Sequence, residues 1–537
     1  MNIESLVRRN IRELVPYSTA RDECGLESGI FLDANESPFN NGFNRYPDPA
    51  QLKLKQIYSS VTGIPSENLF AGNGSDEAID LLIRVFCEPG ADNIVTISPT
   101  YGMYRTAAAV NNIKCTEVPL EADFSLNPQK LLKACVTETK IIFLCSPNNP
   151  TGNLLNKDSV ETVIRNFRGI VVVDEAYIDF SGDGGFAGKV NTFPNLVVLR
   201  TLSKAWGMAG LRVGFAIASA PLVSFLSKVK YPYNVNTLSQ EKAVSLLKRG
   251  NRSQLDTVIF ERERVASELK LVSDVVEVFP SDANFLLVRF KDSKEVFRRL
   301  LNSGIIVRDR TSAEGCRGAL RISIGTGSEN TLLLDRIKGT VAGNALSLLC
   351  RQRSTAETMI SVKIDPGGNL VNEVSTGIPF FNHMLEQIPV HGGFSLQLWA
   401  SGDLENGAHH TIEDVAIVVG EALSELVVSV PGNNRYGFSL PMDESSASVL
   451  IDTGGRAYLK WEADFPAEYV EGIESDMFRH FFDTLSRSMK ATIHVKAGGT
   501  NAHHIAEAIF KAFARALRTA LSSSGDDTKI QSSKGVL

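Results

Sequence analysis

The sequence predicts an α/β protein of two domains: a mostly parallel sheet with a small α/β subdomain, then a duplicated two-layer α/β domain. Residue usage changes between Gly339 and Thr358, because all seven cysteines lie at or before Cys350 and all eight histidines at or after His383. Short apolar runs recur upstream of this change, and one histidine motif occurs twice downstream. The 537 residues also exceed the roughly 250–300 residues that one hydrophobic core usually supports.

The domain boundary is expected where residue usage changes. We expect the first domain at residues 1–345, with its small subdomain formed by the N-terminal arm and about residues 235–345. We expect the second at residues 351–537, as two repeats of about residues 351–430 and 435–525. The connection carries no low-complexity sequence and is predicted to be short and ordered.

Composition excludes several classes of protein. Apolar content of 43%, charged content of 22% and a net charge of −6 describe an ordinary globular protein without the basic excess that nucleic-acid binding needs. The seven cysteines show no Cys-x-x-Cys spacing, which argues against a disulfide framework and for a reducing compartment. Residues Met1–Asn10 lack the apolar core of a signal peptide, and no run reaches the roughly 18 apolar residues of a membrane span. We therefore expect a cytoplasmic protein that contacts neither nucleic acid nor membrane.

Five apolar runs predict the strands of the first domain. They are rich in β-branched residues and continuous rather than alternating, which is typical of strands buried on both faces of a largely parallel sheet. The runs are Ile94–Ile97, Ile141–Leu144, Ile170–Val173, Leu196–Leu199 and Val213–Ile217. In such sheets the chemistry collects in the loops just past the strand ends.

Polar residues follow three of these runs. Cys145–Gly152 is a rigid turn containing Asn149, Asp174–Tyr177 follows the next run, and Arg200–Arg212 follows the third and contains Lys204. One such motif alone is usually a turn, a helix cap or a surface lysine. Together they place an amide, a carboxylate, a phenol, a lysine and an arginine in order at successive strand ends. This order resembles the fold-type I pyridoxal-phosphate aminotransferases.

The resemblance implies a role for each residue. Lys204, flanked by small and hydroxyl residues that leave its amine partly desolvated, would form the Schiff base with pyridoxal 5'-phosphate. Asp174 would pair with the pyridinium nitrogen, Asn149 and Tyr177 would bond the ring hydroxyl, and Tyr101 would stack on the ring. The phosphate would lie on the turn Gly72–Glu77, whose helix amides bind anions. The residues implied at the phosphate are Ser75, Asp76, Thr201, Ser203 and Arg212.

Within these enzymes the finer resemblance is to histidinol-phosphate aminotransferase. It extends over nearly all of residues 1–340, through Pro16–Arg21, Leu32–Glu36, Arg45–Pro49, Asp282–Leu286 and Leu320–Gly325. Arg321 would hold the α-carboxylate of the amino acid, with glutamate the expected donor. Tyr46 would reach the cofactor phosphate of a neighbouring subunit, which implies a dimer, and Tyr17 and Asn35 would face the substrate. Close relatives use other keto acids or decarboxylate, so the ketone stays open here.

The histidines organise the second domain. His409-His-Thr-Ile-Glu413 and His503-His-Ile-Ala-Glu507 repeat one pattern, and isolated His383 and His480 precede the two pairs. On a helix, the first imidazole and the glutamate share one face, while the second imidazole is turned by about 100°. Ser361–Gly368 also matches Ser448–Gly455. We predict two copies of one β-β-α-β-α-like unit.

These residues form a candidate metal centre. A single His-His pair is usually an exposed helix face, but the two pairs and the two isolated histidines together use six of the eight histidines. The predicted ligands divide into two sites of three histidines and one glutamate, drawn from His383, His409, His410, Glu413, His480, His503, His504 and Glu507. Nitrogen and oxygen ligands without thiolate fit a borderline divalent ion.

The motifs resemble imidazoleglycerol-phosphate dehydratase over residues 351–537. Supporting matches are Arg353–Thr358, Asn434–Gly437, Pro441–Glu444, Gly454–Tyr458 and Ser532–Gly535. The resemblance implies two Mn²⁺ ions, although the ligands alone leave zinc, cobalt or nickel open, and shells of 24 subunits with shared sites. Glu357, Glu413 or Glu507 would carry the proton. The implied substrate residues are Glu357 and Gln387, and for the phosphate Arg435, Arg456, Ser532 and Lys534.

Two positions depart from the pattern of this family. Ala408 and Asn382 stand where an acidic residue usually precedes the first His-His pair and the first isolated histidine. The two resemblances imply consecutive steps, since dehydration yields the ketone that the aminotransferase converts. We therefore expect a bifunctional histidine-biosynthesis enzyme. The alternative is an aminotransferase that carries a catalytically inactive, metal-binding assembly module.

Overall fold

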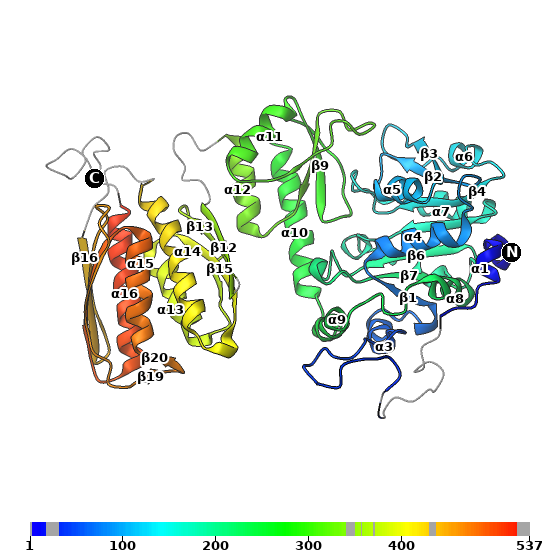
Figure 1. Cartoon of the computed structure of the whole chain (residues 1–537). Helices are drawn as coiled ribbons and strands as arrows, with labels where there is room; N and C mark the ends of the chain where they lie inside the picture. Colours follow the sequence, from blue (N-terminus) through cyan, green and yellow to red (C-terminus); the bar gives the residue numbers. More distant parts are fainter. Residues whose placement is uncertain are drawn as a thin grey trace. The chain divides into compact units, whose positions relative to one another are not determined.

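The computed structural model describes residues 3–17, 30, 32–339, 349–355, 357–368, 371–428 and 436–522. Its contacts divide the chain into two compact units, residues 1–298 with 306–326 and residues 299–305 with 327–537 (Figure 1). The connection expected at residues 345–351 lies mainly outside the described residues, so its position and order stay predictions. Among the described residues, no helix has the length and apolar character needed to cross a membrane.

The first unit is built on a seven-stranded sheet of order β1-β7-β6-β5-β4-β2-β3. Its five strands from β6 to β3 pair in parallel, whereas β7 is antiparallel to both β6 and β1. The mostly parallel sheet is therefore confirmed, with the last predicted run antiparallel. The strands are β1 (Leu69–Gly72), β2 (Asn93–Ser98), β3 (Lys114–Pro119), β4 (Thr139–Cys145), β5 (Ile170–Asp174), β6 (Leu196–Thr201) and β7 (Gly214–Ala218).

Helices cover both faces of this sheet, which is why its strands are continuously apolar. Alternate residues enter opposite clusters: Val171 and Val173 join one, and Ile170 and Val172 join the other. On the first face lie α3 (Leu52–Thr62), α7 (Lys157–Asn166) and α9 (Thr237–Arg249). On the second lie α4 (Ser75–Phe86), α5 (Met103–Val110) and α8 (Ala220–Val229). The short α6 (Pro128–Lys133) packs beside α7.

The N-terminal arm packs differently from our expectation. Ile3, Val7 and Ile11, from η1 (Ile3–Leu6) and α1 (Arg9–Arg12), join the cluster that contains α4 and α8. The amide of Arg8 donates to the carbonyl oxygen of Val85 at 3.0 Å. The spacing of the three apolar residues gives the arm one buried face, so residues 3–12 cover the large sheet rather than the small one.

A second, antiparallel sheet of order β10-β11-β9-β8 forms the small subdomain. Its strands are β8 (Val275–Val278), β9 (Phe285–Phe290), β10 (Arg308–Asp309) and β11 (Ala319–Ser323). Helix α10 (Arg252–Leu269) contacts β8 and β9. The segment also includes α11 (Ser293–Asn302), and α12 (Gly327–Lys338) follows it.

The second unit contains two copies of one motif. The sheets have equivalent orders, β12-β13-β15-β14 and β16-β17-β21-β18. The first copy comprises β12 (Leu349–Ser354), β13 (Thr358–Asp365), β14 (Glu373–Ser375), α13 (Pro379–Gly392), β15 (Ser395–Gly402) and α14 (His409–Val428). The second comprises β16 (Tyr436–Met442), β17 (Ser445–Asp452), β18 (Tyr458–Ala463), α15 (Asp476–Met489), β21 (Thr492–Gly498) and α16 (Ala502–Ala520), with the hairpin β19 (Tyr469–Val470) and β20 (Ile473–Glu474) inserted. Apart from the inserted hairpin, each copy has one strand more than predicted, β14 or β18, which pairs in parallel with its neighbour.

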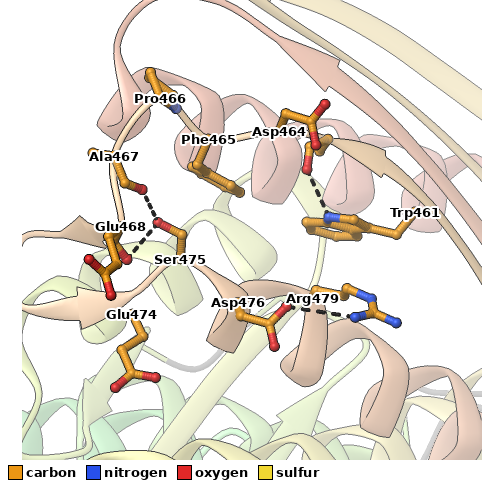
Figure 2. A pocket seen from close by; sticks show the side chains of 11 residues that line it. Trp461, Asp464, Phe465, Pro466, Ala467, Glu468, Glu474, Ser475, Asp476 and Arg479 are labelled. Atoms are coloured by element: carbon orange, nitrogen blue, oxygen red, sulfur yellow. Dashed lines mark hydrogen bonds and ion pairs between the residues drawn. The ribbon is translucent and has the colours of Figure 1, made fainter.

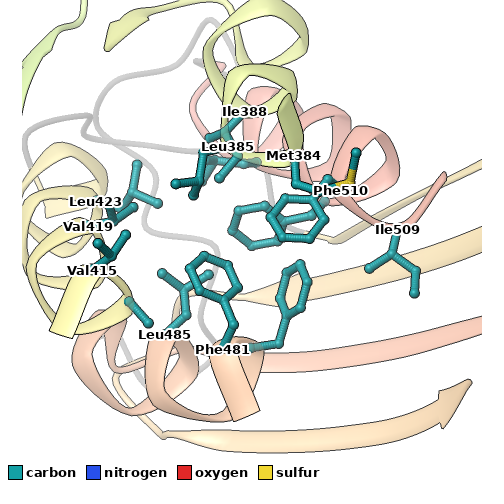
Figure 3. Packing of buried hydrophobic residues seen from close by; sticks show 14 of the residues in the cluster. Met384, Leu385, Ile388, Val415, Val419, Leu423, Phe481, Leu485, Ile509 and Phe510 are labelled. Carbon is teal, nitrogen blue, oxygen red and sulfur yellow. The ribbon is translucent and has the colours of Figure 1, made fainter. Parts of the chain in front are cut away.

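The helices of the two copies pack against each other, α13 on α16 and α14 on α15. Figure 3 shows apolar side chains from all four helices meeting in one cluster. Within it, the ring centroid of Phe481 lies 5.5 Å from that of Phe381 and 5.4 Å from that of Phe510. This pairing brings the isolated histidine of one copy close to the His-His pair of the other.

Candidate active sites

A cavity at the carboxyl ends of β4, β5 and β6 gathers the predicted cofactor residues of the first unit. The loop after each strand supplies part of the lining, because parallel strands end at the same edge of a sheet. The lining residues are Gly74, Ser75, Asp76, Tyr101, Cys145, Asn149, Asp174, Ala176, Tyr177, Thr201, Ser203, Lys204 and Arg212. Every predicted cofactor residue except Tyr46 is among them.

Asp174 is a buried carboxylate with two hydrogen-bond donors. The Tyr104 hydroxyl donates to its Oδ2 at 2.7 Å, and the Ala176 amide donates to its Oδ1 at 3.1 Å. Burial raises the pKa of Asp174 to about 6, against the two hydrogen bonds, which lower it. Sequence reasoning missed Tyr104, although it lies in the same Pro99–Tyr104 segment as Tyr101.

Lys204 lies among cations and aromatic groups. Burial lowers the pKa of its ammonium group, and the charges of Arg321 and Arg212 lower it further. Its Nζ lies 5.7 Å from the ring centroid of Tyr177. Asn149 links this group to Arg321, since its Oδ1 accepts from Arg321 Nη1 at 2.6 Å and its Nδ2 donates to the Tyr177 hydroxyl at 3.5 Å. The structure therefore brings Lys204, Tyr177, Asn149 and Arg321 together.

The N-terminus of α4 also lines the cavity, and its free amides suit an anion. Gly74 precedes the helix at φ +82°, and a Cβ there would lie 2.8 Å from Arg212 Nη2. A Cβ on Gly214 would lie 2.3 Å from the Ser75 amide nitrogen. Both glycines keep the cradle open. An amine, a buried carboxylate and an anion cradle are the donor set that pyridoxal phosphate requires, so the residues fit this cofactor.

Four predicted residues, Arg321 among them, do not line this cavity. Tyr17 and Asn35 are exposed, and Tyr46 stacks on Tyr233 with centroids 4.4 Å apart. Their roles stay predictions. Sequence reasoning also missed Arg310, whose buried Nε has no hydrogen-bond partner among the described residues. Burial lowers the pKa of Arg310, and the charge of Arg321 lowers it further, so two guanidinium groups lie close together.

Two triads form in the second unit, each across the two copies. His383 from α13 lies with His503 and Glu507 from α16, and their ligand atoms are all within 4.8 Å of one another. In the same way His480 from α15 lies with two residues of α14, His409 and Glu413.

The triads differ from the expected sets of three histidines and one glutamate, because His410 and His504 join neither. Both turn about 100° from their neighbours on the helix. Each Asp403 carboxylate oxygen lies 3.2 Å from His410 Nδ1, and Glu444 Oε2 lies 3.0 Å from His504 Nδ1.

The donor atoms of the triads fit a divalent ion. His480 Nε2 is buried and makes no hydrogen bond in the described part of the chain, and it lies 3.7 Å from Glu413 Oε2. His409 Nε2 lies 3.5 Å from the same oxygen. Two imidazole nitrogens and a carboxylate at this spacing would leave open coordination positions.

The two triads are not equivalent. Lys511 Nζ donates to Glu507 Oε1 at 2.7 Å, and Glu507 is almost buried. Although burial alone would raise it, the Lys511 ammonium holds the pKa of Glu507 below its usual value. Glu413 is more exposed, and Ile417 occupies the position that corresponds to Lys511. Sequence reasoning missed Lys511.

The predicted substrate residues of the second domain differ in exposure, and some lie outside the described residues. Glu357 is exposed and close enough to His410 for their charges to interact. Gln387 is buried one turn after His383 and donates to its carbonyl oxygen at 3.1 Å. Arg456 is exposed between β17 and β18. Arg435, Ser532 and Lys534 lie outside the described residues.

The two departures have local explanations. Asn382 Oδ1 accepts from the Thr376 amide at 2.8 Å and from the Thr376 hydroxyl at 2.6 Å, so it holds the turn before α13. Ala408 precedes α14 and packs against the core of the second unit. A carboxylate still reaches this His-His pair, since Asp403 contacts His410.

A separate polar pocket lies beside the start of α15 (Figure 2). The Ser475 hydroxyl donates to the carbonyl oxygens of Ala467 and Glu468, and Asp476 pairs with Arg479 at 3.7 Å. Its lining includes none of the predicted site residues that the structure describes.

Comparisons with known proteins identify a family for each part of the chain. The chain matches the family model of aminotransferase class I and II over residues 33–337 and that of imidazoleglycerol-phosphate dehydratase over residues 376–517. It is 50% identical over 339 residues to the histidinol-phosphate aminotransferase of Parabacteroides distasonis, covering 63% of this chain and 98% of that protein. The enzyme of the same name from Cytophaga hutchinsonii is 48% identical over 345 residues, covering 63% of this chain and 99% of that protein.

A solved structure resembles the first unit. It is the histidinol-phosphate aminotransferase from Clostridium acetobutylicum, with a TM-score of 0.51 and 25% identity over 55% of this chain and 90% of that one. The chain therefore belongs to the class I and II aminotransferases, in their histidinol-phosphate aminotransferase branch, and with its imidazoleglycerol-phosphate dehydratase domain it is a bifunctional enzyme of histidine biosynthesis.

Proposed function

We propose that the second domain dehydrates imidazoleglycerol phosphate to imidazoleacetol phosphate, and that the first domain transaminates this ketone with glutamate to histidinol phosphate. One observation supports both halves: in each domain, predicted site residues from separate segments of the chain come together. The cofactor residues meet at the strand ends of one domain, and two His-His-Glu triads form across the copies of the other. Pyridoxal phosphate on Lys204 and two divalent ions per dehydratase site, Mn²⁺ in this proposal, are the cofactors.

In the first domain, bound pyridoxal phosphate would supply an electron sink for the carbanion left by proton loss. Asp174 would hold the proton of the ring nitrogen. Lys204 Nζ, whose lowered pKa favours a neutral amine, would move the proton at the substrate carbon. Arg321 would hold the carboxylate of glutamate. The adjacent Arg310, with its unpartnered Nε, supplies a second cation for an anionic substrate.

In the second domain, bound metal ions would acidify the imidazole ring and polarise the departing hydroxyl. His383, His503 and Glu507 would hold one ion, and His409, Glu413 and His480 the other. Because both of these glutamates belong to triads, we assign proton transfer to Glu357, which is exposed near His410.

We further propose that the enzyme works as a homo-oligomer. His410 and His504 face away from the triads of their own chain, so each is free to complete a triad of another copy. In the first domain, large apolar side chains are exposed, and one of them, Phe43, lines a pocket together with Tyr46, which suits an aminotransferase dimer. They include Val15, Tyr17, Phe39, Phe43 and Tyr231.

The test follows both steps on the full chain loaded with Mn²⁺ and pyridoxal phosphate. With imidazoleglycerol phosphate and glutamate supplied, histidinol phosphate and 2-oxoglutarate should form in equal amounts. The Lys204→Ala variant should stop at imidazoleacetol phosphate, and His409→Ala should aminate supplied ketone but make none. If the metal-loaded protein makes no ketone yet still assembles, the second domain is an assembly module instead. If supplied ketone is not aminated, the first domain serves another substrate.

A further inference from the structure

In each copy of the second domain a carboxylate holds the second histidine of the pair. His410 Nδ1 lies 3.2 Å from both oxygens of Asp403, seven residues earlier in the chain. His504 Nδ1 lies 3.0 Å from Glu444 Oε2, 60 residues earlier. Asp403 precedes the short η6 (Leu404–Asn406), whereas Glu444 lies in the turn between β16 and β17. The two copies thus form the same contact from different places in the fold.

Both carboxylates are themselves fixed. Asn406 Nδ2 donates to Asp403 Oδ2 at 3.0 Å, and the Asp403 amide donates to the carbonyl oxygen of Glu357 at 3.1 Å. Glu444 Oε1 accepts from the Asn501 amide at 3.1 Å, and Asn501 in turn caps α16 by accepting from the amides of His503 and His504. Glu444 is therefore anchored to the start of α16, which carries His504, whereas Asp403 is held by η6 and by the segment before β13.

This contact selects one form of the imidazole. An imidazole that donates from Nδ1 to a carboxylate keeps its proton there and leaves Nε2 as the only metal-ligating nitrogen. The carboxylate also fixes the ring plane and increases the basicity of Nε2.

We propose that Asp403 and Glu444 are positioning residues that fix His410 and His504 so that each presents Nε2 to a metal ion held by a triad of a second copy of this chain. This rests on the proposed function. In the first copy Asp403 replaces the acidic residue that is missing at Ala408. The His-His pair therefore keeps a supporting carboxylate despite this departure.

The test uses the full chain and the variants Asp403→Asn and Glu444→Gln. Mn²⁺ affinity is measured by titration calorimetry, bound metal by elemental analysis, and assembly by light scattering. Each variant should bind Mn²⁺ about 10- to 100-fold more weakly and dissociate at lower protein concentration. Asp403→Glu should restore most of the affinity. The control Glu405→Gln changes a neighbouring carboxylate in η6 and should match the original protein.

The outcomes separate this inference from the proposed function. If the amide variants keep full Mn²⁺ affinity and assembly while His409→Ala loses metal, the positioning role is wrong and the proposed function stands. If the unaltered protein binds no Mn²⁺, the proposed function fails. A third ion per chain that is lost equally in Asp443→Asn and Glu444→Gln, with assembly intact, would overturn the inference. It would indicate instead a separate metal site at Asp443, Glu444 and His504.

A second measurement needs no variant. In the zinc-loaded, diamagnetic protein, ¹⁵N shifts of the histidines should show two rings protonated at Nδ1 and metal-bound at Nε2 in the positions of His410 and His504. Protonation of these rings at Nε2 would overturn the proposal.

Discussion

At the scale of single residues, the aminotransferase site contains a buried carboxylate, Asp174, whose charged form is less well solvated there than it would be in water. Burial raises the pKa of Asp174 from 3.8 to about 6. The carboxyl group of Asp174 therefore binds its proton more tightly in the folded protein than in the unfolded chain. The contribution of Asp174 to stability is most favourable below its unfolded pKa and is lost as pH rises through about 6.

Asp174→Asn should therefore stabilise the apoenzyme near neutral pH. At about pH 7.5 the free energy of unfolding should rise by up to about 3 kcal/mol, and the gain should fall below about 1 kcal/mol near pH 4. Denaturant unfolding of the cofactor-free protein across this range checks it. A gain independent of pH would mean that the carboxylate is not charged in the apoenzyme. The same variant should bind pyridoxal phosphate more weakly, because the ring nitrogen loses its partner.

Tyr104 should support the charge on Asp174. Tyr104→Phe removes the 2.7 Å hydrogen bond to Oδ2 and leaves the stacking of the ring on Phe143 in place. A hydrogen bond to a charged group contributes about 1.5–3 kcal/mol, so cofactor affinity should fall roughly 10- to 100-fold. Ultrafiltration of bound pyridoxal phosphate measures this. Tyr58→Phe, a buried tyrosine outside the cavity, is the control, and equal losses in both variants would contradict a specific role.

At the scale of secondary-structure elements, the phosphate cradle depends on close approach between β7 and α4. A Cβ on Gly214 would meet the Ser75 amide nitrogen at 2.3 Å, so backbone rather than a flexible side chain must move. Gly214→Ala should displace the first turn of α4 and weaken cofactor binding at least tenfold, as measured by titration with pyridoxal phosphate. Gly210→Ala is the matched control, since a Cβ there has open space within 4 Å. Unchanged affinity in Gly214→Ala would mean that the helix start does not hold the phosphate.

At the scale of the whole molecule, each domain carries its own core. One apolar cluster draws its members from residues 349–517, and another draws its members from residues 54–247. We therefore predict two thermal transitions with separate ligand responses. A ligand stabilises only the domain whose folded state binds it.

Calorimetry with each cofactor removed in turn checks this. Removing pyridoxal phosphate should lower one Tm by several degrees, and chelating the metal should lower only the other. A shift of both transitions on chelation would show that the domains unfold as one unit. The Lys204→Ala and His409→Ala variants assign the transitions, because each should lose the response to one cofactor.

The local parts of this enzyme could be predicted from sequence. Buried parallel strands need continuous apolar runs, so Ile141–Leu144 and Ile170–Val173 identified their strands, and the polar residues that follow them had to meet at one edge of the sheet. The helical period likewise predicted that His409 and Glu413 share a face while His410 turns away.

Contacts between distant segments were decided only by the tertiary structure. Tyr104 with Asp174, Glu444 with His504 and His383 with His503 join residues that no local period relates. Which isolated histidine completes which triad depends on α13 packing against α16 and α14 against α15. The sequence by itself determined the strands β2, β4, β5, β6 and β7, the duplication and the ligand types, because these follow from short-range patterns. The membership of each site depended on how apolar helix faces pair in the folded core, and that choice is made by long-range packing.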